Sequence, residues 1–368
     1  MMRLYNSGCE AFPALIEAIG SAKHSLEINM FIWRDDEIGN KMAEATLAAA
    51  ERGVQVRISI DRYGVVLEKA EECMRSFFHK SQSPIERIKS RILATAYPTP
   101  GMKYPVKDTE SELYRAIMSH PNISVERDTF KADHSKFYVI DEEILFLGGI
   151  NIEDKENGAD MHGRVYGDLM VGLFGHDYVE AFRAAREGRP TDTAYRFPLN
   201  RKTHGIFTVR EHYLDLIRAA EQRLLIVMPY FSPLSDFVQE IAEAARRGVD
   251  VTLMIPKRSN FQDDTNKRTV RRLLRMTGGA VKVYFTPKML HTKLIMSEKT
   301  VSFGSANITK KAFSQLDELN LALPNTDDAF CRALAAVVQD ELAAALECRS
   351  EADIKYRKAI ALFEGLIV

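Results

Sequence analysis

Two spacings of apolar residues alternate through the N-terminal part of the chain. Apolar side chains recur every three or four residues over Glu10–Lys23, which predicts an amphipathic helix, and the apolar run Leu26–Trp33 that follows predicts a buried strand. A second helix is predicted over Lys41–Arg52, where Gly53 is placed to end it as a C-terminal cap. Alternation over Val54–Ile60 then predicts a second strand.

The same order of elements returns in the C-terminal half of the chain. A helix over Leu214–Gln222 is followed by a strand over Leu224–Phe231, a helix over Asp236–Arg247 and an alternating strand over Val249–Ile255. Residues 49–56 read Ala-Ala-Glu-Arg-Gly-Val-Gln-Val, and the corresponding stretch downstream reads Ala-Ala-Arg-Arg-Gly-Val-Asp-Val. The chain is therefore interpreted as an internal duplication.

Alternating strands and helices predict an α/β fold in which a mostly parallel sheet is covered by helices in each half. We expect an N-terminal half at residues 1–187 with an insertion near 65–105, a linker at 188–205 that contains Pro190 and Pro198, and a C-terminal half at 206–368. The economical arrangement packs the two similar halves face to face about a pseudo-twofold axis, with one shared active-site cleft.

A polar motif follows in each half, on what reads as a strand hairpin. Its first copy comprises His134, Lys136, Asp141, Gly148, Gly149 and Asn151. Its second copy comprises His291, Lys293, Glu298, Gly304, Ser305 and Asn307. Because successive strand residues face opposite sides, the histidine and the lysine of each copy emerge on the same side. Recurrence of so many polar positions in one chain favours a functional site over two satisfied core histidines.

The residue types suit transfer of a phosphoryl-type group. One imidazole would attack phosphorus and form a phosphohistidine, while the other would protonate the leaving alcohol and then activate the incoming one. Lys136 and Lys293 would neutralise the phosphate oxygens, and Asn151 and Asn307 would donate hydrogen bonds to them. The small residues of the motif, Gly149 and Ser305, would leave room for this anion.

A nucleophilic imidazole needs an acceptor that holds its other nitrogen. The candidates are Asp168, in Tyr-Gly-Asp-Leu-Met-Val, and Glu318, in Leu-Asp-Glu-Leu-Asn-Leu. Each lies in an apolar stretch, where an unpaired carboxylate would be costly. Asp317 competes with Glu318 for this role, and a salt bridge at a strand edge is the alternative for both acids.

Composition limits the classes of function. Lys and Arg total 50 against 51 for Asp and Glu, so the net charge of −1 gives no global attraction to polyanions. The cysteines show no close pairing typical of a metal site or a disulfide framework, which suits a reducing compartment. No signal peptide and no membrane-spanning window is predicted. We expect a cytoplasmic protein without a cofactor or a metal.

The paired motif resembles the phospholipase D superfamily, whose signature is His-x-Lys-x4-Asp-x6-Gly-Gly/Ser-x-Asn in two copies. The first copy here matches in full, whereas the second has Glu298 in place of aspartate and a turn shorter by one residue. Similarity to cardiolipin-synthase-type members extends over nearly the whole chain. It includes Asn6-Ser7-Gly8, Ala22-Lys23-His24-Ser25, Arg52-Gly53-Val54, Asp61 and Met228-Pro229-Tyr230-Phe231.

The resemblance implies two α-β-α sandwich halves, a metal-independent two-step mechanism and a first-copy histidine as the nucleophile. It also implies phosphatidyl transfer between lipid alcohols, with a glycerophospholipid as substrate, and a structural role for the motif aspartate. In contrast to many such synthases, this sequence predicts no N-terminal transmembrane segments. No oligomer is needed to complete the site, because one chain supplies both motif copies.

Three segments could associate peripherally with a membrane surface. They are the aromatic and basic insertion near 74–93, the basic helix around Lys267–Arg275, and the C-terminal stretch Tyr356–Val368. Packing on the core or a solvated helix face is the alternative for each. A nucleic-acid partner is disfavoured by the pI of 6.8.

Other activities remain open at the level of sequence. Phospholipase D hydrolysis, or a phosphodiesterase or nuclease activity, would use the same two histidines. An inactive binding module is disfavoured because both His–Lys pairs are intact. Metal-dependent hydrolysis through His134, His162 and nearby acids would explain neither lysine.

Overall fold

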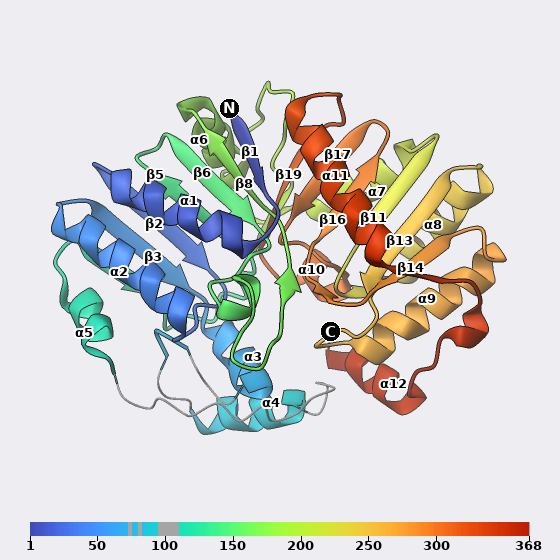
Figure 1. Ribbon diagram of the computed structural model, residues 1–368, viewed down its shortest axis with the longest axis horizontal. Helices are drawn as coiled ribbons and strands as arrows, with labels where there is room; N and C mark the ends of the chain where they lie inside the picture. The colour runs from blue at the N-terminus through green and yellow to red at the C-terminus, as the bar shows by residue number, and fades with distance from the viewer. Residues whose placement is uncertain (73–75, 80–82, 95–109, 368) are drawn as a thin grey trace. The chain divides into compact units, whose positions relative to one another are not determined.

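Parallel and antiparallel strands share one sheet in each half of the chain. The computed structural model describes residues 1–72, 76–79, 83–94 and 110–367. Its chain divides into two units, Met1–Arg183 and Ala184–Val368, and Figure 1 shows a helix-covered sheet in each. Mixed α/β halves of this kind agree with the predicted fold class.

The first unit is built on a sheet whose described strands follow the order β1-β8-β6-β5-β2-β3-β4. In chain order their bounds are β1 Met2–Tyr5, β2 Ser25–Met30, β3 Gln55–Ile60, β4 Ile123–Glu126, β5 Phe137–Ile140, β6 Ile144–Gly148 and β8 Met170–Phe174. The neighbours β2, β3 and β4 run parallel, and every other pair is antiparallel.

Helices cover both faces of this sheet. Helices α1 (Gly8–Ser21) and α2 (Glu37–Glu51) lie along one face (Figure 1), where Tyr138 and Ile140 join their core. Phe137 points to the other face and contacts Phe182 of α6 (His176–Arg186), with ring centroids 5.0 Å apart. The alternation along β5 therefore places adjacent residues in opposite layers of an α-β-α sandwich.

The second unit repeats this plan with the strand order β10-β9-β19-β17-β16-β11-β13-β14-β20. The bounds are β9 Leu199–Arg201, β10 Ile206–Phe207, β11 Arg223–Val227, β13 Asp250–Pro256, β14 Lys282–Thr286, β16 Leu294–Ser297, β17 Thr300–Gly304, β19 Glu318–Pro324 and β20 Leu346–Cys348. Here β11, β13 and β14 run parallel, and the other pairs are antiparallel.

One face of the second sheet packs against three helices, and the other against a fourth. The bounds are α7 Val209–Ala219, α8 Ser235–Arg246, α9 Asp263–Thr277 and α11 Ala329–Ala344. Leu224, Ile226 and Leu253 point into the core shared with α7, α8 and α9. Phe303 faces the other way and stacks on Phe330 of α11, with ring centroids 6.1 Å apart.

The predicted helices and strands of the duplicated pattern are confirmed in both halves, but the expectation of a mostly parallel sheet is wrong. Within the main sheet of each unit, parallel pairing is confined to the β-α-β part. The motif strands β5 and β6, like β16 and β17, are joined by tight turns, and a tight turn can join only antiparallel neighbours.

The structure places strand residues inside the segment predicted as a linker. Strand β9 lies within residues 188–205 and pairs with β19, so Leu199 and Asn200 belong to the sheet of the second unit. The boundary between the compact units falls after Arg183.

Among its described residues the insertion contributes two helices, α3 (Arg62–Glu72) and α4 (Pro84–Ala94). Helix α4 buries polar residues: Glu86 pairs with Arg62 at 2.7 Å, and the Ser90 hydroxyl donates to the Val66 carbonyl at 3.0 Å. Its three isoleucines, Ile85, Ile88 and Ile92, are exposed. Met74, which the sequence analysis grouped with this segment, lies outside the described residues. No described helix combines the length and apolarity needed to cross a membrane.

Candidate active site

The motif residues of each unit lie at the ends of its central antiparallel strands. We call His134, Lys136, Gly149, Asn151 and Asp168 the first half-site. We call His291, Lys293, Ser305, Asn307 and Glu318 the second half-site. Apart from Gly149, all of these residues are at most 8% exposed, and Gly149 is buried as well. The histidine and lysine of each copy precede β5 or β16 rather than lying within the strand.

Neighbouring side chains fix the extended segment that carries His134. The Asn29 amide, on β2, donates to the carbonyl of Ser135 at 3.0 Å and to its hydroxyl at 3.1 Å. The ring of Phe31 meets the His134 ring edge to face, with centroids 4.8 Å apart. Lys136 is fully buried, and its Nζ donates to the His134 carbonyl at 2.6 Å. Sequence reasoning missed Asn29 and Phe31, which carry no motif signal.

The carboxylate of Asp168 lies directly against Gly149. A Cβ atom at Gly149 would stand 2.2 Å from Oδ2 of Asp168 and 2.6 Å from Oδ1. The backbone N–H of Leu169 donates to Oδ1 at 2.8 Å, which fixes the carboxylate in this place. The space left by the glycine, expected to serve an anionic substrate, is therefore occupied by the carboxylate itself.

The second half-site repeats the arrangement around the histidine. His291 follows β15 (Met289–Leu290), and Lys293 Nζ donates to the His291 carbonyl. The ring of Tyr230 also meets that of His291 nearly edge to face, with centroids 6.0 Å apart. The Tyr230 hydroxyl donates to Asn260 at 2.7 Å. An aromatic ring therefore flanks the histidine in each copy of the motif.

Glu318 contacts the small residue of the second motif. The Ser305 hydroxyl donates to Glu318 Oε2 at 2.5 Å and accepts from the Leu319 N–H at 3.0 Å. Asp317, the competing candidate, instead accepts from the backbone N–H of Lys202 at 2.9 Å. Glu318 is thus the acid whose position matches that of Asp168.

Both motif asparagines carry an unsatisfied oxygen. Asn151 is 3% exposed and Asn307 is 5% exposed, and the Oδ1 atom of each is buried with no hydrogen-bond partner among the described residues. Buried polar atoms in native proteins are nearly always hydrogen-bonded. A ligand that enters either half-site would therefore meet an amide oxygen able to accept a hydrogen bond.

The motif acids Asp141 and Glu298 clamp the turn before the neighbouring strand. Asp141 accepts from the N–H groups of three consecutive residues, Lys23, His24 and Ser25, at 2.7–2.8 Å. Glu298 does the same for residues 221–223 at 2.9–3.3 Å.

Burial alone would raise the pKa of both clamp carboxyls. The backbone donors outweigh it, so that the pKa of Asp141 lies below its usual range and that of Glu298 falls to about 2. The longer Glu298 side chain therefore makes the same contacts as the aspartate usual at this position of the signature.

A hydrogen-bonded triangle that sequence reasoning missed holds the second motif turn. The Tyr213 hydroxyl donates to the Ala306 carbonyl at 2.8 Å and accepts from the Asn320 amide at 2.7 Å. Asn320 Oδ1 accepts from the Ala306 N–H at 3.2 Å. The signal was present, because Asn320 lies two residues after Glu318 and so on the same face of β19.

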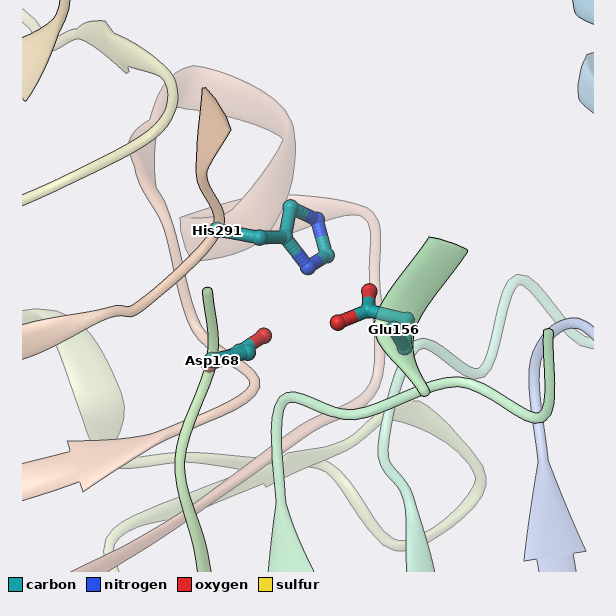
Figure 2. Close-up of side chains that lie close together, drawn as sticks. All are labelled: Glu156, Asp168 and His291. Atoms are coloured by element: carbon teal, nitrogen blue, oxygen red, sulfur yellow. The ribbon is translucent and has the colours of Figure 1, made fainter. Parts of the chain in front are cut away.

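A further buried acid, Glu156, ends the short helix η1 (Asp154–Glu156) of the first unit. Figure 2 shows its carboxylate and that of Asp168 turned toward the same space; the view also draws His291 of the second half-site. Two carboxylates are a partial ligand set for a divalent cation, which usually takes six or more oxygen atoms. His162, considered above as a metal ligand, is exposed.

Comparison with known proteins places this geometry in a family. Residues 15–162 and 213–343 match the family model described as the PLD-like domain of cardiolipin synthase. Cardiolipin synthase B of Escherichia coli K12 is 25% identical over 347 residues, which cover 88% of this chain and 76% of that protein. Cardiolipin synthase A of Edwardsiella ictaluri is 25% identical over 367 residues, covering 93% and 69%.

Solved structures show the same fold. The phosphatidylserine synthase of Haemophilus influenzae aligns with a TM-score of 0.70 at 12% identity, covering 98% of this chain and 91% of that one. The polyphosphate kinase of Porphyromonas gingivalis aligns with a TM-score of 0.56 at 15% identity, and the alignment covers 100% of this chain and 52% of that one. With the matched segments spanning most of both units, the chain belongs to the family of the PLD-like domain of cardiolipin synthase, and so to the phosphatidyltransferase and phospholipase D class of enzymes.

Proposed function

We propose that this protein transfers a phosphatidyl group from a glycerophospholipid to an alcohol, in the manner of a cardiolipin synthase. The observation that carries the proposal is the duplicated half-site, in which a buried His–Lys pair, a buried asparagine and a buried carboxylate recur together. The curated relatives named cardiolipin synthase support a phospholipid substrate.

The proposed reaction uses one histidine from each half-site in two displacements. In the first, His134 attacks phosphorus, the bond from phosphorus to the leaving alcohol breaks, and His291 gives that alcohol its proton. In the second, His291 takes the proton of the acceptor alcohol, whose oxygen attacks phosphorus and breaks the bond to His134. Each histidine ends in its starting state, so the cycle needs no external oxidant, reductant or cofactor.

The lysines and asparagines would stabilise the charge that builds on the phosphate oxygens. The side chains of Lys136 and Lys293 are at most 1% exposed, and an ammonium in such surroundings acts on a nearby anion far more strongly than in water. The amides of Asn151 and Asn307 would add hydrogen bonds. We assign Asp168 and Glu318 as positioning groups for the histidines, through which we expect them to act.

A lipid substrate requires access to a membrane surface, and helix α4 supports peripheral association. Ile85, Ile88 and Ile92 are 66%, 59% and 49% exposed, and their spacing places them along one side of the helix. Arg87, Lys89 and Arg91 lie on the same helix. Exposed isoleucines flanked by basic residues are typical of an amphipathic helix that lies in a membrane interface.

The test is to incubate the purified chain with phosphatidylglycerol vesicles, with and without added alcohol, and to identify products by mass spectrometry. Cardiolipin and glycerol support the synthase activity. Phosphatidic acid alone would make the protein a hydrolase, and cleavage of single-stranded DNA or a small phosphodiester without a lipid product would make it a nuclease-like enzyme.

Single-residue variants test the two histidine roles. His134→Ala and His291→Ala should each abolish turnover while leaving the thermal unfolding midpoint nearly unchanged. The control His204→Ala, at an exposed histidine, should retain full turnover. If His134 is the nucleophile, His291→Ala still accumulates a covalent phosphoenzyme and His134→Ala does not; the reverse pattern exchanges the roles. Asp168→Asn and Glu318→Gln should lower the rate by about 10²- to 10⁴-fold.

A further inference from the structure

The second unit contains a basic cavity that the proposed reaction does not use. It has a volume of about 360 Å³ and is bounded by α9, by the segment between β12 (Phe231–Ser232) and α8, and by α12 (Lys358–Ile367). Figure 1 shows α9 and α12 side by side at this place. We call this cavity the α9 pocket. No residue of the second half-site lines it.

Cations dominate the lining of the α9 pocket. Five basic residues line it, and no aspartate or glutamate does. The five are Arg268, Arg271, Arg272, Arg275 and Lys310. Only Glu351 offsets this charge within the described chain, pairing with Arg275 at 3.0 Å and with Arg271 at 3.8 Å. The side chains of the other three have no ion-pair partner among the described residues.

The clustering of like charges destabilises helix α9 when it is considered by itself. Arg268 on one side of the pair Arg271–Arg272, and Arg275 on the other, each lie three and four residues from its two members, at spacings where like charges on a helix repel. The Nε atom of Arg271 is also buried without a hydrogen-bond partner among the described residues. A bound anion would relieve the repulsion and satisfy this donor.

The acids closest to the α9 pocket in the chain are engaged elsewhere. Asp264 accepts two bonds from the Arg357 guanidinium at 2.7 and 2.9 Å, and Asp263 pairs with Lys267. Glu364 accepts from the backbone N–H of Thr265 at 2.7 Å, which fastens α12 to α9. These contacts shape the pocket and leave its positive charge in place.

Hydroxyl groups and an apolar rim complete the α9 pocket. Ser232, Thr265, Thr269 and Tyr356 line it beside the cations. Leu234, also in the lining, is 39% exposed. Leu362 is 57% exposed and lies one helical turn before the lining residue Gly365, on the same side of α12. A cationic pocket with exposed leucines at its edge suits a phosphate group presented at a lipid surface.

The α9 pocket adjoins the second half-site along the chain. Strand β12 begins one residue after Tyr230 and pairs in parallel with β18 (Ile308–Thr309), which follows Asn307 directly. The pocket residues Ser232 and Lys310 come at the far ends of these two short strands. A group held in the pocket is thus separated from the half-site by one strand pair.

We propose that the α9 pocket binds the phosphate group of an anionic phospholipid that is not the molecule undergoing reaction. This second lipid would hold the C-terminal unit on an anionic membrane. The inference goes beyond the proposed transferase activity and would stand if the enzyme proved to be a hydrolase, because the binding involves no step of the reaction.

The test measures co-sedimentation of the full-length protein with phosphatidylcholine vesicles that contain or lack phosphatidylglycerol. The variant Arg268→Gln with Arg272→Gln should weaken partitioning onto the anionic vesicles by roughly ten- to thirtyfold. The matched control, Arg218→Gln with Arg332→Gln, removes the same charge from exposed sites outside the pocket and should change it by less than about threefold. Equal losses in both variants would reduce the effect to net charge and overturn the proposal.

A second variant separates the shape of the pocket from its charge. Gly365→Phe places a ring at the pocket wall and keeps every cation, and a Cβ at Gly365 meets no heavy atom within 4 Å. Thermal unfolding should confirm that this variant folds, and its partitioning should fall as in the arginine variant. Unchanged partitioning in the folded Gly365→Phe protein would refute binding in the pocket.

The source of the phosphate is tested by competition. Inorganic phosphate and glycerol 3-phosphate, added at concentrations matched in ionic strength by sodium chloride, should displace the protein from vesicles no more than the salt does. Displacement by these anions in excess of the salt control, lost in Arg268→Gln with Arg272→Gln, would show a site for soluble phosphate and overturn the lipid assignment.

Discussion

The substitution Gly149→Ala directly tests the contact between Gly149 of the first motif copy and the carboxylate of Asp168. The added methyl group would stand 2.2 Å from Asp168 Oδ2, whereas ordinary contact begins near 3.4 Å. The carboxylate must therefore move by about 1 Å, or the backbone must shift. Asp168 is 2% exposed and held by the Leu169 N–H, so it has little freedom to move without losing that bond.

The size of the effect follows from this displacement. Misplacing a catalytic group by 1 Å costs about 10²-fold in rate, and we expect a loss of that order in kcat through the position of the histidine that Asp168 orients. Overpacking at a buried site costs about 1–3 kcal/mol in the free energy of unfolding. Gly149→Ala should therefore remain folded but be far less active.

The assay compares kcat for phosphatidyl transfer with the thermal unfolding midpoint. Gly20→Ala makes the same chemical change in α1, where a Cβ meets nothing within 4 Å, and should preserve activity and raise stability by up to about 1 kcal/mol. In the double variant Gly149→Ala with Asp168→Ala the stability loss should largely disappear, because the clash is gone. A folded Gly149→Ala protein with nearly full activity would refute the argument.

Three further outcomes are expected. Glu298→Gln should lower the free energy of unfolding by about 1 kcal/mol at pH 7. Because folding lowers the pKa of Glu298 from 4.5 to about 2, the difference in unfolding free energy between the wild type and the variant should be complete above pH 4.5 and vanish as the pH falls through 2. A difference that persists at pH 2 in urea titrations would contradict a stabilising role for the hydrogen bonds that the Glu298 carboxylate accepts. Tyr213→Phe should cost about 1–3 kcal/mol in the same titrations, since it removes the donor to the Ala306 carbonyl and leaves the Asn320 amide only its 3.5 Å bond to the Ser302 hydroxyl, and an unchanged midpoint would count against the triangle. Dialysis against EDTA should leave the rate of lipid product formation unchanged, and loss of activity restored by a divalent ion would refute the phosphohistidine scheme.

Much of the fold could be predicted because periodicity reports which face of an element is buried. The predicted helices and strands of the duplicated run overlap α1, α2, α7 and α8 and the strands that accompany them. Strand direction was predicted less well, since the pattern along β5 is the same whether its neighbour runs parallel or antiparallel. For the isoleucines of α4 the sequence left two alternatives, an exposed amphipathic face and packing on the core; the structure exposes them, and Glu86 and Ser90 occupy the buried side.

The candidate site could be proposed from the sequence as a set of residues but not as a set of contacts. The identities of the motif residues follow from spacing alone. That Asp168 reaches Gly149 depends on the pairing of β6 with β8, in which Gly148 stands opposite Met170. Such a register is set by tertiary packing and leaves no mark in the local pattern.

In both copies of the motif the small residue contacts a buried carboxylate. In the first unit a glycine leaves space that the Asp168 carboxylate fills, and in the second unit a serine donates its hydroxyl to the Glu318 carboxylate. The pairs differ in both members, yet each brings a buried acid against the residue two positions before the motif asparagine. A requirement for substrate space alone would not select an acid at the facing position in both halves. The small residue is therefore better explained by the carboxylate it contacts, and the acid is as much a part of each half-site as the histidine.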